Sequence, residues 1–200
     1  MNTKGYDNIP GELFYYITFL ARALPARSIK TFIELLIGCL LTQSGFVTSA
    51  WWILDMQNQW FSYHKWLETG KWSYLQLMRQ WVKLFIRLFG QQRIYLCIDD
   101  SIVLRASKKA PMSQFHHQHG SKPNLSQYVR GQCWVGLAAT VERLGKNTAL
   151  PLLFRLTPDK GNTSKIQVAK TLLRGVRQLL VNKPVTVLVD SWYIIQYITN

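Results

Sequence analysis

The spacing of hydrophobic and polar positions changes near residue 90. Before that point, apolar residues recur every three or four positions, which is typical of helices that bury one face. The spacing predicts helices over residues 12–24, 29–43, 48–58 and 73–89, with Ser28 as the N-cap of the second. The last of these is preceded by Ser73 and followed by Gly90, residues that are common at helix ends. We therefore expect an all-helical N-terminal region over residues 1–90.

After residue 90 the apolar positions fall into short runs, which are typical of strands. Such runs occupy residues 93–98, 132–142, 149–156 and 185–189. Between the third and fourth, Ser164–Leu180 has apolar residues at helical spacing with basic residues outside them, and a final helix is expected from about Trp192. This order predicts an α/β domain over residues 91–200. A right-handed crossover would place the first and fourth strands side by side in one sheet.

Carboxylates follow both of these strands. Asp99 and Asp100 come after the first strand and Asp190 comes after the fourth. Ligands of open α/β sheets bind beyond the carboxyl ends of strands, and paired carboxylates suit Mg²⁺ or Mn²⁺. Each aspartate could instead cap a turn or a helix. Because neighbouring residues of a strand face opposite ways, only one of Asp99 and Asp100 is expected to be a ligand.

Charge indicates the substrate class. The chain has 24 Lys and Arg against 10 Asp and Glu, a net charge of +14, and residues 91–200 hold fifteen of the basic and five of the acidic residues. A strongly basic surface suits a polyanion, so the expected substrate of a carboxylate-held metal is a phosphodiester. No phosphate-binding loop, GxGxxG or GxSxG motif is present, which argues against a kinase, a dehydrogenase or a serine hydrolase. We find no signal peptide or membrane span, so a cytoplasmic location is expected.

The segment between residues 105 and 131 is basic and contains no acid. If it lies beside the active site, it would contact a DNA backbone. Its candidate DNA contacts are Arg105, Lys108, Lys109, His117, Lys122, Tyr128 and Arg130. Two alternatives stay open: an ordinary solvated loop, and a histidine metal site made by His116, His117 and His119.

A second candidate for DNA recognition lies in the helical region. The predicted helices 29–43 and 48–58, joined by residues 42–45, have the outline of a helix-turn-helix. The second helix contains Trp51, Trp52 and Leu54 but no Arg or Lys that could bind guanine edges. Core packing is therefore the alternative explanation for this pair.

Three motifs together carry a family resemblance. They are Ile-Asp-Asp-Ser within residues 93–105, Tyr-Val-Arg-Gly-Gln-Cys-Trp-Val at residues 128–135, and Leu-Val-Asp-Ser-Trp-Tyr within residues 185–193. Over residues 91–193 the chain resembles a DDE-type insertion-sequence transposase, of the branch with an Asp-Asp-Thr/Ser motif. The resemblance implies a ribonuclease H-like catalytic domain that hydrolyses transposon ends with divalent metal and then transfers strands through the freed 3′-hydroxyl. It implies Asp100 and Asp190 as catalytic, metal-binding residues, with Asp99 as the alternative to Asp100.

The same resemblance implies the partners. These are double-stranded DNA at terminal inverted repeats, bound with the help of residues 1–90, a homodimer as one assembly on that DNA, and association with the nucleoid. Such enzymes also use a third carboxylate beyond the second aspartate, and residues 191–200 contain neither Asp nor Glu. We therefore expect a C-terminally truncated transposase with an incomplete sheet, unable to complete the metal site alone. The alternatives are a non-catalytic DNA-binding remnant or repressor of transposition, and an unrelated basic nuclease.

Overall fold

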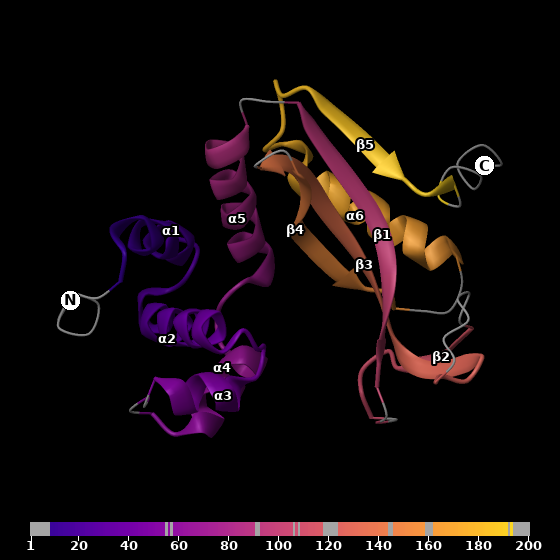
Figure 1. Ribbon diagram of the computed structural model, residues 1–200. Coiled ribbons are helices and arrows are strands. Elements are labelled where there is room, and N and C mark those ends of the chain that lie inside the picture. Colours follow the sequence, from indigo (N-terminus) through magenta and orange to yellow (C-terminus); the bar gives the residue numbers. More distant parts are fainter. Residues whose placement is uncertain are drawn as a thin grey trace. The chain divides into compact units, whose positions relative to one another are not determined.

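The computed structural model describes residues 9–54, 56, 58–90, 93–105, 107, 109–117, 124–143, 146–158, 162–191 and 193. The chain divides into two compact units, Met1–Leu84 and Phe85–Asn200. Each unit has its own elements, which Figure 1 labels along the chain. They are described in turn.

The first unit is helical, as its spacing predicts. It contains α1 (Gly11–Ala21), α2 (Ala26–Thr42), α3 (Val47–Ile53), α4 (Trp60–Thr69) and most of α5 (Tyr74–Phe89). The helix expected over 48–58 ends at Ile53, and α4 was not predicted. The Ser28 prediction is also wrong: α2 begins at Ala26, and the buried Ser28 hydroxyl accepts a hydrogen bond from Trp66 Nε1 at 3.0 Å. Ser73 does cap α5, because its hydroxyl accepts the Gln76 amide at 3.3 Å.

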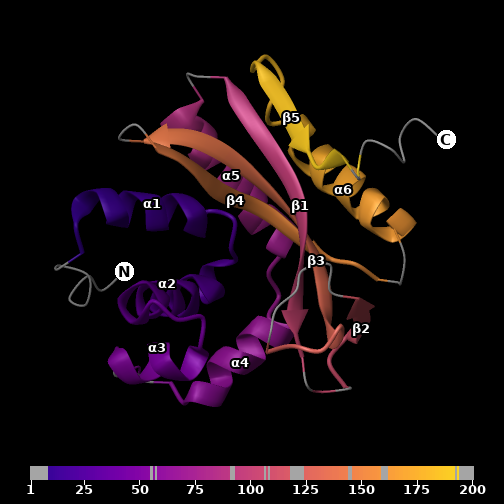
Figure 2. The ribbon, with the colours of Figure 1, turned by 45° about the vertical axis from the view of Figure 1, so that its right-hand side comes forward.

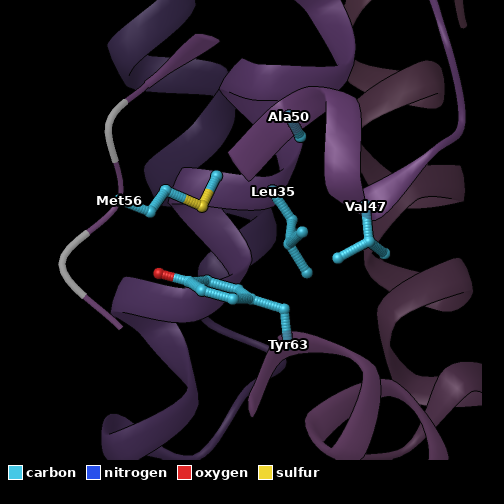
Figure 3. Packing of buried hydrophobic residues seen from close by; sticks show 5 residues of the cluster. All are labelled: Leu35, Val47, Ala50, Met56 and Tyr63. Carbon is cyan, nitrogen blue, oxygen red and sulfur yellow. The ribbon is translucent and has the colours of Figure 1, made fainter. Parts of the chain in front are cut away.

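The α2–α3 pair is held by a hydrophobic core. Figure 3 shows Leu35 from α2 among the side chains of Val47, Met56 and Tyr63, with Ala50 nearby. Gly38 lets the two helices approach closely, since a Cβ at this position would collide with Ala50. These contacts support core packing as the role of the pair.

Among the described residues, no single helix has the length and hydropathy of a membrane span. Taken together, α2 and α3 have the length and composition of a membrane span, but the pair is bent by 89°.

The second unit is a mixed sheet with one helix packed on it. The strands are β1 (Ile94–Leu104), β2 (Gln114–His117), β3 (Tyr128–Arg143), β4 (Lys146–Leu156) and β5 (Val185–Val189), and the helix is α6 (Asn162–Arg177). β1, β2 and β4 pair antiparallel with β3, whereas β5 pairs parallel with β1 (Figure 2). The predicted fold class, a mixed α/β sheet preceded by helices, is therefore confirmed, as is the pairing of the first and fourth predicted strands.

The two faces of the sheet differ in burial. On β1, Ile94, Leu96 and Ile98 are 2–4% exposed, and Ala139 and Leu137, the β3 partners of Leu96 and Ile98, are also buried. The helix α6 packs against β3 and β4 and buries its own apolar stripe. The residues between them on β1 point the other way, and Tyr95 is 41% exposed.

The structure corrects the strand ends. β1 was expected to end at Asp99–Asp100 but continues to Leu104, because Ser101–Leu104 pair with residues 131–134 of β3. β3 and β4 begin earlier than predicted, and β2 lies in a stretch expected to be a loop. The helix predicted over 164–180 runs from Asn162 to Arg177. Ser191 and Tyr193 are helical, while the rest of the final predicted helix lies outside the described residues.

Candidate active site

Asp100 lies at the point where the buried face of β1 meets solvent. It follows Ile94, Leu96 and Ile98 on the same face, because residues two apart on a strand point the same way. Its side chain is 21% exposed. Three other elements supply hydrogen-bond donors to it, which makes it the most extensively contacted of the three predicted site aspartates.

The strongest of these contacts comes from α6. Lys165 Nζ lies 2.8 Å from Asp100 Oδ2, and the lysine side chain is 26% exposed. A hydrogen bond between two ionised groups is shorter and stronger than one between neutral groups. Because both groups are largely shielded from water, this ion pair is screened less by salt than a surface pair. It ties the start of α6 to the middle of β1.

Tyr193 contacts the second oxygen of Asp100. Its hydroxyl donates to Asp100 Oδ1 at 3.3 Å, and its amide donates to the carbonyl of Asp190 at 2.9 Å. Burial raises the pKa of Tyr193, and the nearby Asp100 charge raises it further. The phenol therefore stays protonated at neutral pH and remains a hydrogen-bond donor.

Cys133 approaches Asp100 from β3. Its thiol is 3.6 Å from Asp100 Oδ2, and the residue is 1% exposed. Burial raises the pKa of Cys133, so the group acts here as a neutral thiol.

Asp99 faces the opposite side of β1 and is exposed. Its Oδ1 accepts the amide of Asp100 at 2.8 Å, a local contact of the kind aspartates often make with the backbone. Asp190 follows Val189, which is paired with Ile98, so the register brings Asp190 beside Asp99 and one residue from Asp100. Its Oδ1 accepts the Ser191 hydroxyl at 3.1 Å. The structure therefore brings the three predicted aspartates to one level of the sheet.

The donor chemistry of these residues fits a hard divalent ion, because carboxylate oxygens are the preferred ligands of Mg²⁺ and Mn²⁺. Within the described part of the chain, however, no three His, Cys, Asp or Glu residues are grouped as a metal site. Of these carboxylates, Asp100 is the one whose two oxygens both accept bonds from distant side chains. Asp100 is thus the aspartate whose carboxylate is held by tertiary contacts, and Asp190 follows the neighbouring strand β5.

Three of the seven predicted DNA contacts, His117, Tyr128 and Arg130, lie on one face of the β2–β3 ladder. Phe115 is paired with Arg130, and His117 with Tyr128, so these four side chains share a face, which we call the aromatic–basic face. The Arg130 guanidinium lies 4.6 Å from the centre of the Phe115 ring, and the His117 and Tyr128 rings meet edge to face at 5.2 Å. Phe115 and Tyr128 are 58% and 59% exposed.

The remaining predicted contacts lie nearby in the chain or outside the described residues. Arg105 continues β1, where its amide donates to the Arg130 carbonyl at 3.1 Å, and its Nε donates to Gln132 Oε1 at 3.1 Å. Lys109 is exposed in the turn before β2. Lys108, Lys122 and His119 lie outside the described residues. His116 is on the face opposite His117, so the described residues of the predicted histidine metal site do not converge.

Three important side chains were missed by the sequence reasoning. Lys165 was assigned only to the polar side of a helix, Tyr193 only to a motif, and Phe115 to a loop. Of the three, only Phe115 could have been found from the sequence, because it is an aromatic residue within the basic, histidine-containing segment 105–131. The contacts of Lys165 and Tyr193 depend on tertiary packing.

Comparison with known families gives one match. A family model described as DDE superfamily endonuclease matches residues 47–196, more than half of the chain. Searches of curated proteins and of solved structures gave no match. The matched stretch begins in α3 and passes through all five strands to the residues after β5. Members of this superfamily are transposase-like nucleases that act on DNA and generally use divalent metal ions. Because this family model covers more than half of the chain, the chain belongs to the DDE superfamily of endonucleases.

Proposed function

We propose that this chain is a transposase, or a transposase fragment, of the kind that cuts DNA at transposon ends and joins the freed strand to a target, with Asp100 and Asp190 as its metal-binding carboxylates. The observation that supports the proposal is the parallel pairing of β1 with β5, which brings Asp190 to within one residue of the level of Asp100 in a member of a DNA nuclease superfamily. Mg²⁺ or Mn²⁺ is the proposed ion.

When bound, such an ion activates the attacking oxygen and neutralises charge on the phosphate. The side chains of this protein would instead hold the carboxylates in position. Tyr193 contacts both aspartates, through its hydroxyl to Asp100 and its amide to the Asp190 carbonyl. It is therefore a positioning residue, since its own pKa keeps the phenol neutral and donating.

Cleavage of a labelled transposon-end duplex tests the assignment. If the chain is catalytically competent by itself, it should cut with Mg²⁺ or Mn²⁺, and Asp100→Asn and Asp190→Asn should not. Glu142→Gln is the matched control, because Glu142 is an exposed acid at the far end of β3. Equal cutting by all four proteins would refute the assignment of the two aspartates.

The aromatic–basic face is the proposed DNA-binding surface, together with Arg105 and Lys109. Arg130 is six residues along β3 from Gly136, the partner of Asp99, which is about 20 Å at the rise of a strand, so this surface lies on the face of the sheet that carries Asp99. A duplex that reached from Arg130 to Asp99 would span roughly six base pairs at 3.4 Å each, with Asp100 on the opposite face of the same strand. Basic side chains would neutralise its phosphates, and exposed aromatic rings would contact sugars or bases.

The salt dependence of DNA binding tests this surface. Replacing Arg105 and Lys109 by Gln should reduce the slope of log affinity against log salt by about 2, because each phosphate contact contributes about 0.9. Arg174→Gln with Arg177→Gln removes the same charge from exposed positions of α6 and should leave the slope unchanged. The reverse result would place DNA on α6 instead.

Residues 1–90 are proposed to assist in binding the terminal inverted repeats, and residues 91–200 to form the ribonuclease H-like catalytic domain. A homodimer on DNA and a nucleoid location are part of the same proposal. Binding of inverted-repeat DNA in preference to scrambled DNA, lost on removal of charges from α5, would support the first assignment.

A non-catalytic DNA-binding product is the second candidate. It is favoured by the lack of a group of three metal-binding residues within the described part of the chain. The cleavage assay separates the two: specific binding to transposon ends without cutting in either metal would favour a repressor.

A further inference from the structure

Lys165 occupies the position beside Asp100 where a metal ion would be expected to bind. We propose that its ammonium group is a built-in counter-cation, which compensates the charge of Asp100 and must leave when a divalent ion binds. This proposal rests on the metal-binding role of Asp100 in the proposed function. It assigns to α6 a part in controlling the metal affinity of the site.

The geometry of the pair separates it from a surface ion pair. Lys165 Nζ is 2.8 Å from Asp100 Oδ2, and the two side chains are 26% and 21% exposed. On α2, by contrast, Lys30 and Glu34 are 3.8 Å apart, and their side chains are 56% and 16% exposed, so the lysine is largely in solvent. Exposed pairs of that kind contribute little, whereas a shielded, hydrogen-bonded pair has a larger interaction energy. The Lys165 contact is therefore strong enough to affect a competing cation.

The other contacts of Asp100 show why competition is expected. An ionised carboxylate has about four lone-pair positions, so the Tyr193 hydroxyl and a metal ion can share Asp100. The Cys133 thiol is a neutral neighbour and does not repel a cation. A lysine ammonium does, because two positive charges a few ångströms apart repel strongly where water is partly excluded. Of the three donors, Lys165 is the one that a metal ion would displace.

The alternative is that Lys165 only fastens α6 to the sheet. In that case its removal would lower stability and leave metal affinity unchanged or reduced. The two roles therefore predict opposite changes in metal affinity.

Titration of the full chain with Mn²⁺ in the absence of DNA distinguishes the two roles. Binding is measured by calorimetry and by electron paramagnetic resonance. Lys165→Met keeps the aliphatic stem and removes the charge, so it should bind Mn²⁺ about tenfold or more tightly than the unaltered protein, the factor that corresponds to losing one charged hydrogen bond. Arg174→Met removes one positive charge from an exposed position on the same helix and should leave the affinity within about twofold.

Asp100→Asn tests whether the gain depends on Asp100. Combined with Lys165→Met, it should abolish the tighter binding. If the double variant keeps the gain, the effect of Lys165 is a general one of charge and the proposal fails.

A measurement on the unaltered protein avoids the risk that a variant misfolds. Acylation of lysines by an amine-selective reagent, followed by mass spectrometry, should show Mn²⁺ increasing the modification of Lys165 severalfold, since its ammonium is released, while Lys30 stays constant. No increase at Lys165 under saturating Mn²⁺ would overturn the proposal.

The outcomes separate this inference from the function on which it rests. If the unaltered protein and Lys165→Met bind Mn²⁺ equally, the counter-cation role is wrong and the metal site survives. If neither binds Mn²⁺, both the counter-cation role and the proposed metal site are wrong.

Discussion

Asp99 and Asp100 are neighbours on one strand, yet they occupy the two different faces of the sheet. Asp100 continues the buried row of Ile94, Leu96 and Ile98 and is contacted from β3, α6 and the segment after β5. Asp99 continues the row of Tyr95 and Cys97 and is exposed. The comparison shows that packing, and not residue type, decides which carboxylate is held in a fixed position.

Loss of each carboxylate should have very different effects on DNA cleavage. Asp100→Asn should reduce the rate by on the order of 100-fold or more, since even outer contacts of metal sites are worth 10–100-fold. Asp99→Asn should reduce it by less than about tenfold. Single-turnover cleavage of a transposon-end duplex measures both, and a larger loss for Asp99→Asn would invert the comparison of the faces.

Substitutions of core residues should give the next largest difference between the two faces of the sheet. Leu137 on β3 is fully buried and paired with Ile98, so Leu137→Ala should lower the free energy of unfolding by about 2–5 kcal/mol. Tyr95 is 41% exposed on the other face, and Tyr95→Ala should cost about 1 kcal/mol or less. Urea unfolding followed by circular dichroism provides the two values. Similar losses would mean that both faces are packed alike.

Alkaline pH offers a third test, through Tyr193. Its pKa is raised in the folded protein by burial and by Asp100, whereas an unfolded tyrosine has a pKa of about 10. The stability linked to this phenol is therefore fully present below pH about 10 and is lost as the pH rises towards the folded value.

Melting temperatures between about pH 8 and pH 11 should fall less steeply for Tyr193→Phe than for the unaltered protein. Tyr63, whose pKa is also raised by burial and then by Glu34, lies in the helical unit and provides the comparison. If Tyr63→Phe alone changes the slope, the phenol near Asp100 does not control alkaline stability.

The smallest expected effect concerns the helix that covers the buried face. A Cβ at Gly175 of α6 would meet Leu153 Cδ2 at 3.6 Å, an ordinary packing distance. Gly175→Ala should therefore stabilise the protein by about 0.5–1 kcal/mol through the better helix propensity of alanine. Thermal unfolding measures this gain, and destabilisation would show that α6 lies closer to the sheet than its packing distance indicates.

Much of the sheet could be predicted from the sequence. The apolar runs that become β1 and β5 are continuous, and a crossover helix between strands restricts how they can pair. The extension of β1 could not be predicted, because Asp99, Asp100 and Ser101 resemble a strand end until pairing with β3 supplies their backbone partners. β2 is only four residues long and largely polar, so its pairing with β3 carries no periodic signal.

The candidate aspartates were inferred from apolar runs that can be recognised locally. Asp190 does follow the end of β5, whereas Asp100 lies inside β1, which continues to Leu104. The ion pair with Lys165 joins residues 65 positions apart and depends on how α6 lies on the sheet, which spacing does not specify. In the helical unit, α4 escaped prediction because its apolar residues do not form a clear stripe.

The pairing of β1 with β5 also orders events in time. β1 and β3 are close in the chain, whereas the parallel register joins Ile94 to Val185. Contacts between distant segments form late, and a protein emerging from the ribosome makes its N-terminal contacts first. A nascent chain thus acquires the aromatic–basic face before Asp190 has been synthesised. Each new copy can therefore fold its β2–β3 ladder before its two aspartates can come together.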